Sequence, residues 1–493
     1  MKWFTVHSFS FLVLVLLLAG CAEVPSETPL APDISVPEGP ALSVIEGDVE
    51  STENALIVFS SQRIPEGFEA ALAAHGGTVV ASHDAVGVVV ASGLTAESAA
   101  ALQAYGGIMA VTPDVLIPLE LPDVVQYEAA LGGEITNDNP ETAFFFPRQW
   151  HLRAIQADVA WAAGATGSPD VTVAILDTGI GYTHPDVAGL VDLGRSASFV
   201  PSDDALVEAF FPGAHPVADL HWHGTHVAAT VSSNGLAAAG VTSKTTLMGV
   251  KVCNVNRSCA TSGVLAGLMY AADQGADIAN LSLGGLFLQS ANPGFVAVIN
   301  RAYNYAARQG MVVVTSAGNA TADLDRNIVP LPTDIPLADR TLTHLPSLYA
   351  VYCNAPQVIC VSATGPTASG GTNGPWVDED APTTYTNFGR SAIDVAAPGG
   401  GAGGAVWAAC STFSLIVGGG ICQTGTFVVG AGGTSMASPH AAGVAALIVA
   451  NGAGTPAQIR SLIHQTADNV GASGTDSFYG KGRVNAASAA GVN

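Results

Sequence analysis

Residues 171–179 read Val-Thr-Val-Ala-Ile-Leu-Asp-Thr-Gly, an apolar run that ends in an aspartate and a glycine turn. Such an uninterrupted run is typical of a strand that is buried on both faces of a parallel sheet. Similar runs, separated by helical stretches that stop at glycines, recur at residues 247–252, 278–283, 311–315 and 358–363. The alternation predicts an α/β domain: a doubly wound, mostly parallel sheet with helices on both faces.

Ligands of such sheets bind beyond the carboxyl ends of the strands, so polar residues there are the first candidates for chemistry. Asp177 directly follows the first strand, and Asn319 follows the strand at 311–315. A carboxylate at a buried strand end needs a hydrogen-bonding partner, and an imidazole N–H is a suitable one. Taken alone, an aspartate before a glycine is also a common turn former.

Two further motifs stand at the starts of apolar helices. The first is His223-Gly224-Thr225-His226, which could be a pair of metal ligands but lacks the nearby acidic ligand that such a site would need. The second is the motif at 433–440, in which Ser435 lies where free backbone N–H groups favour negative charge. A serine at that place is also an ordinary helix N-cap. The chain order Asp177, His223, Ser435 is one of the known orders of a catalytic triad, and no Gly-x-Ser-x-Gly elbow occurs.

Together these motifs resemble those of the subtilases, the subtilisin-like serine proteases. The resemblance extends over residues 149–493 and predicts a catalytic domain at 148–493. Its further matches are Gln149-Trp150-His151-Leu152, His184-Pro185-Asp186, Ser282-Leu283-Gly284-Gly285, Ala317-Gly318-Asn319 and Asp394-Val395-Ala396-Ala397-Pro398-Gly399.

The resemblance implies a role for each matching residue. Ser435 would be the nucleophile, His223 the general base, and Asp177 the group that orients the imidazole. Asn319 and the Ser435 backbone N–H would form the oxyanion hole. The segment Ser282, Leu283, Gly284 and Gly285 would be an exposed strand edge that pairs with substrate. No cofactor is required for this chemistry, and a structural calcium ion at Asp186 is left open.

The N-terminal part is predicted to carry targeting and regulatory segments. Residues 1–20 have the pattern of a signal peptide, and Leu18-Ala19-Gly20-Cys21 resembles a bacterial lipobox in which Cys21 is lipidated; an ordinary secretory signal is the alternative. Residues 21–54 are predicted to be a disordered tether. Residues 55–118 have the order βαββαβ of a small split-βαβ domain, similar to the inhibitory and chaperoning pro-domain of the family. Residues 119–147 are an acidic connector with the expected processing site.

Charge is distributed unevenly along the 493 residues. The chain has 16 basic and 40 acidic side chains, a net charge of −24. Residues 22–147 hold 19 acidic side chains and one basic one, a net −18, whereas 148–493 hold 21 acidic and 14 basic, a net −7. This balance argues against nucleic acid or anionic lipid as a partner. We expect membrane contact only through the lipid of the precursor.

Six cysteines follow Cys21, and their spacing does not resemble a metal site, so no metal is predicted. They form three close couples separated by long gaps, which predicts three loop-closing disulfides in an oxidising envelope; some could instead be free buried thiols. The predicted pairs are Cys253–Cys259, Cys353–Cys360 and Cys410–Cys422.

These features predict an exported serine endopeptidase that is made as a self-processing zymogen. Its partners would be protein or peptide substrates and its own pro-domain, and we expect a monomer. The precursor would sit in the bacterial cell envelope by its lipid, and the mature enzyme would be secreted, periplasmic or extracellular. Two alternatives stay open: a processing protease for one envelope partner, and a lipid-anchored binding protein without catalysis.

Overall fold

The computed structural model describes residues 50–119, 126–133, 135, 138–290, 293–331 and 336–492, all of which belong to one compact unit. The predicted signal peptide, Cys21 and nearly all of the predicted tether lie outside the described residues. Within the described residues no helix is both long and apolar enough to cross a membrane.

The N-terminal domain has the predicted order βαββαβ and forms an antiparallel sheet in the order β2-β3-β1-β4. Its apolar core includes Phe59 and Phe68, whose rings meet edge to face at 4.8 Å. The last strand is longer than predicted and continues to Pro118. The elements are β1 (Ser51–Phe59), α2 (Phe68–Ala74), β2 (Thr78–His83), β3 (Val88–Ser92), α3 (Ala96–Leu102) and β4 (Ile108–Pro118).

The main domain, residues 148–492, is built on a seven-stranded sheet in the order β19-β16-β12-β10-β6-β8-β7. Every pair of neighbouring strands in it is parallel, which confirms the predicted fold class. The strands are β6 (Thr172–Asp177), β7 (Ala197–Ser198), β8 (Thr246–Lys251), β10 (Ile278–Leu281), β12 (Val312–Ser316), β16 (Val358–Thr364) and β19 (Val395–Pro398).

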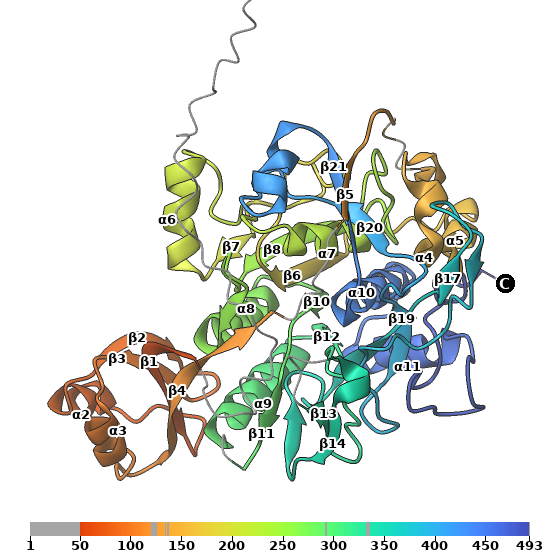
Figure 1. Cartoon of the computed structure of the whole chain (residues 1–493). Coiled ribbons are helices and arrows are strands. Elements are labelled where there is room, and N and C mark those ends of the chain that lie inside the picture. Colours follow the sequence, from red (N-terminus) through yellow and green to blue (C-terminus); the bar gives the residue numbers. More distant parts are fainter. Residues whose placement is uncertain are drawn as a thin grey trace, which may run out of the picture. The chain divides into compact units, whose positions relative to one another are not determined.

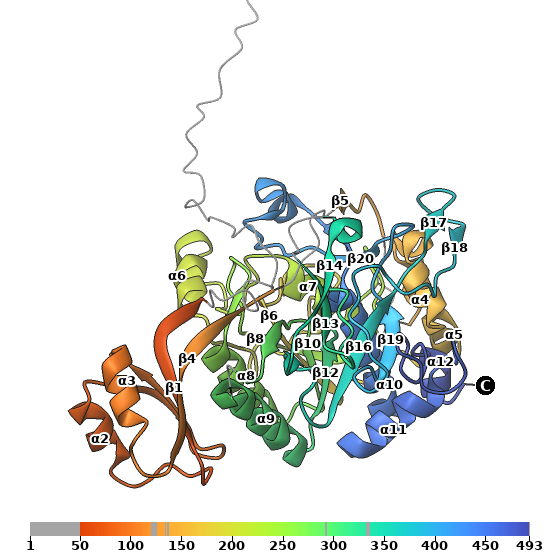
Figure 2. The ribbon, with the colours of Figure 1, turned by 60° about the horizontal axis from the view of Figure 1, so that its bottom comes forward.

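Helices cover both faces of this sheet (Figures 1 and 2). Val173 and Ile175 of β6 belong to the apolar cluster that includes residues of α7 (His223–Val231) and α10 (Thr434–Ala450). The alternate residues of β6 belong to the cluster that includes residues of α8 (Thr261–Asp273) and α9 (Pro293–Arg308). Because successive side chains of a strand point to opposite faces, all of β6 is buried.

Several elements were not predicted, among them one helix and one strand. Helix α6 (Pro201–Phe210) follows β7, and the short strand β5 (Gln126–Ala129) lies in the connector. Strand β5 joins the hairpin of β20 (Val406–Ala409) and β21 (Phe427–Ala431) in a sheet ordered β20-β21-β5.

The remaining elements are short or peripheral. They are α4 (Trp150–Ala154), α5 (Ala157–Ala162), β9 (Ser258–Ala260), β11 (Leu286–Leu288), β13 (Ile328–Leu331), β14 (Thr341–His344), β15 (Leu348–Ala350), β17 (Ala368–Ser369), β18 (Trp376–Val377), α11 (Pro456–Thr466) and α12 (Ala486–Ala489). The 3₁₀ helices are η1 (Pro140–Thr142), η2 (Phe146–Arg148), η3 (Leu337–Asp339), η4 (Val417–Gly419) and η5 (Ile421–Thr424).

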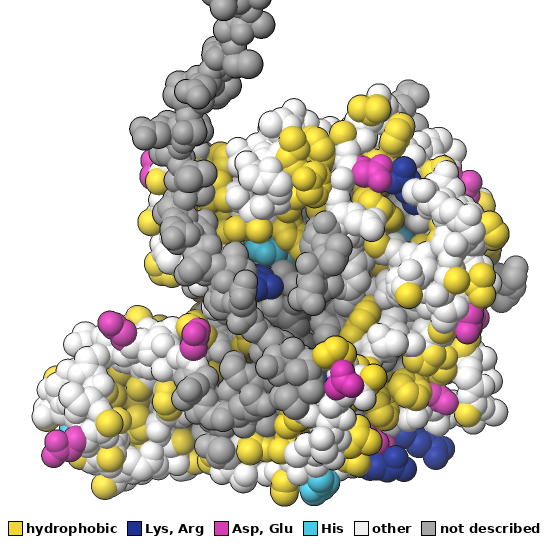
Figure 3. Space-filling model, in the orientation of Figure 1, with side chains coloured by type: hydrophobic (Ala, Val, Ile, Leu, Met, Phe, Trp, Pro, Cys, Tyr) yellow, Lys and Arg dark blue, Asp and Glu magenta, His cyan; other side chains and the backbone are white. Residues whose placement is uncertain are grey.

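Three disulfides are present, and they join the predicted couples of cysteines. Each closes a loop of 6 to 12 residues in sequence separation. On the face drawn in Figure 3, most of the surface of the described residues is apolar or uncharged, in keeping with a sequence in which 11% of the residues are charged.

Candidate active site

The sheet and its helices bring the three predicted triad residues to one place. Asp177 is the last residue of β6, His223 is the first residue of α7, and Ser435 is in the first turn of α10. All three side chains are almost fully buried. Strand ends and helix starts thus meet at the carboxyl edge of the sheet, where the topology predicts a site.

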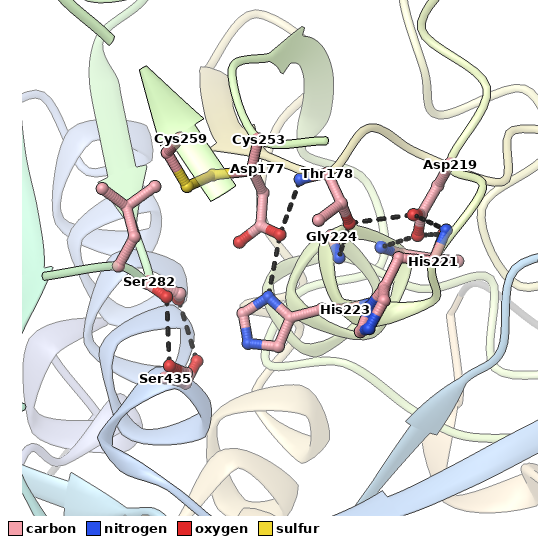
Figure 4. A network of polar contacts seen from close by, with 12 residues as sticks. Asp177, Thr178, Asp219, His221, His223, Gly224, Cys253, Cys259, Ser282 and Ser435 are labelled. Carbon is pink, nitrogen blue, oxygen red and sulfur yellow. Dashed lines mark hydrogen bonds and ion pairs between the residues drawn. A yellow bond between two sulfur atoms is a disulfide. The ribbon is translucent and has the colours of Figure 1, made fainter. Parts of the chain in front are cut away.

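Asp177 and His223 form a buried ion pair or hydrogen bond. The distance from Nδ1 of His223 to Oδ1 of Asp177 is 2.8 Å, and the same oxygen accepts the Thr178 backbone N–H at 2.8 Å. With Nδ1–H donated to the carboxylate, the other nitrogen of a neutral imidazole is an acceptor. That nitrogen, Nε2, is buried and has no hydrogen-bond partner among the described residues. In Figure 4 it is turned toward Ser435.

Ser435 makes a reciprocal pair of hydrogen bonds with Ser282. The Ser435 hydroxyl donates to the Ser282 carbonyl oxygen at 3.0 Å, and the Ser282 hydroxyl lies 2.8 Å from the Ser435 carbonyl oxygen. Asn280 Nδ2 donates to the Ser282 hydroxyl at 2.9 Å, and the Ser438 hydroxyl lies 2.7 Å from it. The position of Ser435 is therefore fixed by neutral groups on β10, on Ser282 directly after it, and on α10 itself.

Asn319 lies beside the start of α10. Its Oδ1 accepts the Thr434 backbone N–H at 2.9 Å and the Thr434 hydroxyl at 2.8 Å, so Nδ2 is the donor end of the amide. A Cβ built on Gly433, which has a φ of +148°, would lie 3.7 Å from Asn319 Nδ2 and 3.8 Å from the Ser435 backbone nitrogen. The Asn319 amide and the Ser435 backbone N–H thus both border the position that a side chain of residue 433 would occupy.

A second buried carboxylate, Asp219, was not predicted. Its Oδ1 accepts the Thr178 hydroxyl at 2.8 Å, and its Oδ2 accepts the Thr225 hydroxyl at 2.5 Å and backbone N–H at 3.0 Å. The Thr178 hydroxyl in turn accepts the Gly224 backbone N–H at 2.9 Å. Burial raises the pKa of Asp219, while the bonds from the two threonines oppose this rise.

The Asp219 network joins the turn after β6 to the first turn of α7, and so holds His223 in register with Asp177 (Figure 4). The only sequence signal for it is an acidic residue four positions before His223. A single aspartate in such a loop is more often a turn former, so the residue pattern does not distinguish Asp219 from its neighbours.

The end of the N-terminal domain contacts the main domain next to this site. Residues 116–118 of β4 pair antiparallel with β9, and the Leu119 N–H donates to the Arg257 carbonyl at 2.7 Å. The carboxylate of Asp114 accepts the backbone N–H of Ser262 at 2.8 Å and its hydroxyl at 2.7 Å, in the first turn of α8. Strand β9 contains Cys259, whose disulfide with Cys253 lies beside Asp177.

Residues 282–285 differ in exposure from the strand edge that was expected, and their role in binding substrate stays a prediction. They follow β10 outside any strand and are buried, whereas an exposed strand edge was expected. One reason is the N-terminal domain: a Cβ built on Gly285 would lie 3.9 Å from a methyl group of Ile117 in β4. The Ser282 hydroxyl also forms hydrogen bonds with Asn280 and with the Ser435 carbonyl oxygen, so the side chain does not point toward an exposed strand edge.

Asp186 is poorly suited to a calcium ion. Its two carboxylate oxygens accept the backbone N–H groups of Leu236, Ala237 and Ala238 at 2.7 to 3.0 Å. Calcium requires oxygen ligands, and here N–H donors surround the carboxylate. No group of three or more His, Cys, Asp or Glu side chains that could hold a metal ion occurs in the described part of the chain.

Comparisons with known proteins show the family to which the chain belongs. The chain matches the model of the subtilase family over residues 168–482. It is 34% identical over 350 residues to thermitase of Thermoactinomyces vulgaris, covering 70% of this chain and 97% of that protein. It is 30% identical over 382 residues to the M-protease of Shouchella clausii (strain KSM-K16), covering 77% of each chain.

Two solved structures share the fold. The epidermin leader peptide processing serine protease (EpiP) of Staphylococcus aureus superposes with a TM-score of 0.65 at 19% identity, over 89% of this chain and 98% of that one. Fervidolysin of Fervidobacterium pennivorans gives a TM-score of 0.62 at 23% identity, over 91% of this chain and 62% of that one. From the family match and these identities, the chain belongs to the subtilase family and is a serine protease, a hydrolase.

Proposed function

We propose that this protein is an exported serine endopeptidase in which Asp177, His223 and Ser435 form the catalytic triad. One observation carries the proposal. The unpartnered Nε2 of His223, the Ser435 hydroxyl and two N–H donors around Gly433 converge, while Nδ1 of His223 is held by Asp177 at 2.8 Å. A nucleophile, a base with an orienting group and an oxyanion site are the parts that acyl transfer requires.

The first half of the reaction forms the acyl-enzyme. The Ser435 hydroxyl turns from the Ser282 carbonyl oxygen to Nε2 of His223 and gives up its proton there as its oxygen attacks the scissile carbonyl carbon. Asp177 stabilises the imidazolium that results. The negative oxygen of the tetrahedral intermediate accepts hydrogen bonds from Asn319 Nδ2 and from the Ser435 backbone N–H.

The second half releases the products. The imidazolium of His223 gives its proton to the leaving amine, so the peptide bond breaks and an ester to Ser435 remains. Water then gives a proton to His223 and attacks the ester carbonyl through the same oxyanion site. The acid leaves, and the proton returns to the Ser435 oxygen.

We also propose that the precursor is a zymogen inhibited by residues 55–118. Strand β4 is added to the edge of β9 beside Asp177, where an extended substrate would pair by its backbone. The Asp114 carboxylate strengthens this contact because it accepts N–H and O–H bonds at the positive end of α8. Self-processing in the connector at 119–147 would free the main domain.

The proposed cellular location of the enzyme depends on where the precursor is cut. A lipid on Cys21 would remain with the pro-domain, and residues 148–493, with a net charge of −7, carry no basic excess for anionic headgroups. The precursor is therefore membrane-bound in this proposal, and the released enzyme is soluble outside the cytoplasm. Fractionation should leave a Ser435→Ala precursor in the membrane pellet and mature wild type in the soluble fraction; mature enzyme that needs detergent for extraction contradicts this.

A fluorophosphonate probe tests the catalytic proposal. Purified wild type should be labelled and Ser435→Ala should not, and the variant should also accumulate as an unprocessed precursor. A binding protein without catalysis would leave both unlabelled. A mature-sized Ser435→Ala product made without a helper protease would contradict the assigned nucleophile. Profiling the wild type with a peptide library then separates a broad endopeptidase from a processing enzyme for one partner.

A further inference from the structure

Strand β5 occupies the outer edge of β21 within the connector. Residues Gln126–Ala129 pair antiparallel with β21, in the register Gln126↔Gly430 and Ala129↔Phe427. Only four residues are involved, and of these only Tyr127 is of a type that is favoured in strands. The backbone edge that β21 offers therefore contributes more to the pairing than the sequence of β5.

Two hydrogen bonds fix which groups of β21 face this edge. The Ala130 N–H donates to the Thr426 carbonyl at 2.8 Å, whereas the Cys410 N–H donates to the Phe427 carbonyl at 2.9 Å on the other side, toward β20. Because these directions alternate along a strand, Thr426, Val428 and Gly430 present their N–H and C=O groups to β5.

This edge leads directly to the proposed nucleophile. Strand β21 ends at Ala431, four residues before Ser435. A cavity of about 540 Å³ adjoins the edge and is lined by Gln126 of β5, by Gly430 and by Tyr385, among others. The Tyr385 hydroxyl accepts the Gly433 N–H at 2.9 Å, so the cavity reaches the turn that precedes Ser435.

The chain contacts both sides of the site in the direction of a substrate. Residues 116–119 lie on β9, beside Asp177, and residues 126–129 lie on β21, beside the turn to Ser435. In a polypeptide substrate, the residues before the scissile bond likewise come earlier in the chain than the residues of the leaving group. The β5–β21 pairing thus has the place and direction of a leaving-group segment.

We propose, on the basis of the proposed function, that the edge of β21 binds the leaving-group side of extended polypeptide substrates as an added strand. Strand β5 occupies this edge until it is displaced. The bound class is an extended polypeptide that is recognised by its backbone beyond the scissile bond.

One side chain adds a preference. Glu128 of β5 forms a salt bridge of 2.6 Å with Arg148, whose guanidinium lies over the rings of Phe145 and Trp407 at 5.1 and 5.6 Å. These rings hold the guanidinium at the edge. A substrate with an acidic residue opposite Val428, the partner of Glu128, is therefore favoured.

Quenched fluorogenic peptides test the edge with the processed enzyme. Two peptides share all residues up to the second one after the scissile bond, and their leaving sides are two or eight residues long. The long peptide should have a KM about 5- to 10-fold lower, the effect of a few backbone hydrogen bonds. N-methylation of its leaving side should abolish this gain at alternate residues only. Equal KM values, or equal effects of N-methylation at every residue, would overturn the proposal.

A binding assay separates this proposal from the catalytic one. In full-length Ser435→Ala, a labelled peptide of sequence 126–133 competes with β5 and no cleavage is needed. Glu128→Pro removes an N–H that faces β21, whereas Ala129→Pro removes one that faces outward, a position where an edge strand tolerates proline. Glu128→Gln controls for the salt bridge. The peptide should bind the Glu128→Pro protein at least 5-fold more tightly than the Ala129→Pro protein, and equal affinities would refute the site.

Discussion

Helices α7 and α10 each present one proposed catalytic side chain in their first turn, but different groups hold the two side chains. His223 is held by two buried carboxylates, Asp177 directly and Asp219 through Thr178 and Gly224. Ser435 is held by hydroxyl, carbonyl and amide groups without formal charge. The base, which gains a charge during the reaction, is thus placed among anions, and the nucleophile is not.

The strongest test of this comparison is Asp177→Asn. The amide can no longer accept and stabilise the imidazolium proton in the same way, and it favours the wrong tautomer of His223. By analogy with the Ser-His-Asp template, kcat should fall about 10⁴-fold with little change in KM. Steady-state kinetics with one fluorogenic peptide measures this, and a loss below about 10-fold would show that the carboxylate does not orient the base.

The next effect concerns the neutral surroundings of Ser435. Asn319→Ala removes the Nδ2 donor that borders the space over Gly433. The expected loss is about 10²- to 10³-fold in kcat, because the donor acts on charge that develops only in the transition state. Fluorophosphonate labelling of the variant at the same final extent, but more slowly, would show that the nucleophile is intact. An unchanged kcat would remove Asn319 from the oxyanion site.

The sequence predicted those parts of the molecule whose signal is local. The apolar run of β6 predicted both the buried strand and the place of Asp177, because an uninterrupted apolar run that ends in a turn is typical of a strand buried on both faces of a parallel sheet. Helix α6 is an exception, because it was not predicted although Pro201 followed by Asp203 and Asp204 is a local signal of a helix start.

Strand β5 and Asp219 had no such signal. The stretch Gln126–Ala129 is too short for its residue pattern to predict a strand, and it pairs with the backbone edge that β21 offers. Asp219 becomes important only when the fold brings Thr178, from a distant part of the chain, to its carboxylate. Both depend on tertiary contacts, which a pattern of residue types does not encode.

A third prediction, with a smaller effect, concerns the pH dependence of stability. Helices α7 and α10 each carry a further buried histidine outside the proposed triad. Burial lowers the pKa of His226 on α7 to about 3 and that of His440 on α10 to about 4. His440 donates from Nδ1 to the Met436 carbonyl at 2.7 Å, so its Nε2 accepts a hydrogen bond from Nδ1 of His151 at 2.8 Å. A second proton on Nε2 of His440 would therefore point at the N–H of His151.

The sign of the pH dependence follows from these lowered values. The unfolded chain binds protons below about pH 6.5 whereas the folded protein does not, so stability is full above that pH and falls as the pH drops toward 4. At pH 5 each histidine should lower the free energy of unfolding by about 2 kcal/mol relative to pH 8. Urea unfolding of Ser435→Ala, which prevents autolysis, measures this. His440→Gln should remove about half of the decrease in the free energy of unfolding that His226 and His440 together cause between pH 8 and pH 5. An unchanged decrease would contradict the lowered pKa of His440.

The smallest predicted effect tests whether the Asp219 network positions His223 or only stabilises the fold. The Thr225 hydroxyl donates to Asp219 and accepts the Gly181 N–H at 2.8 Å. Thr225→Val keeps the shape but leaves these partners unpaired, so the free energy of unfolding should fall by about 1 to 2 kcal/mol, whereas Thr225→Ser keeps both bonds. If the network also positions the base, kcat of the valine variant should fall several-fold at constant KM, and the serine variant should recover it. A stability loss without any change in kcat would restrict Asp219 to a structural role, and would leave Asp177 as the only carboxylate that acts on His223.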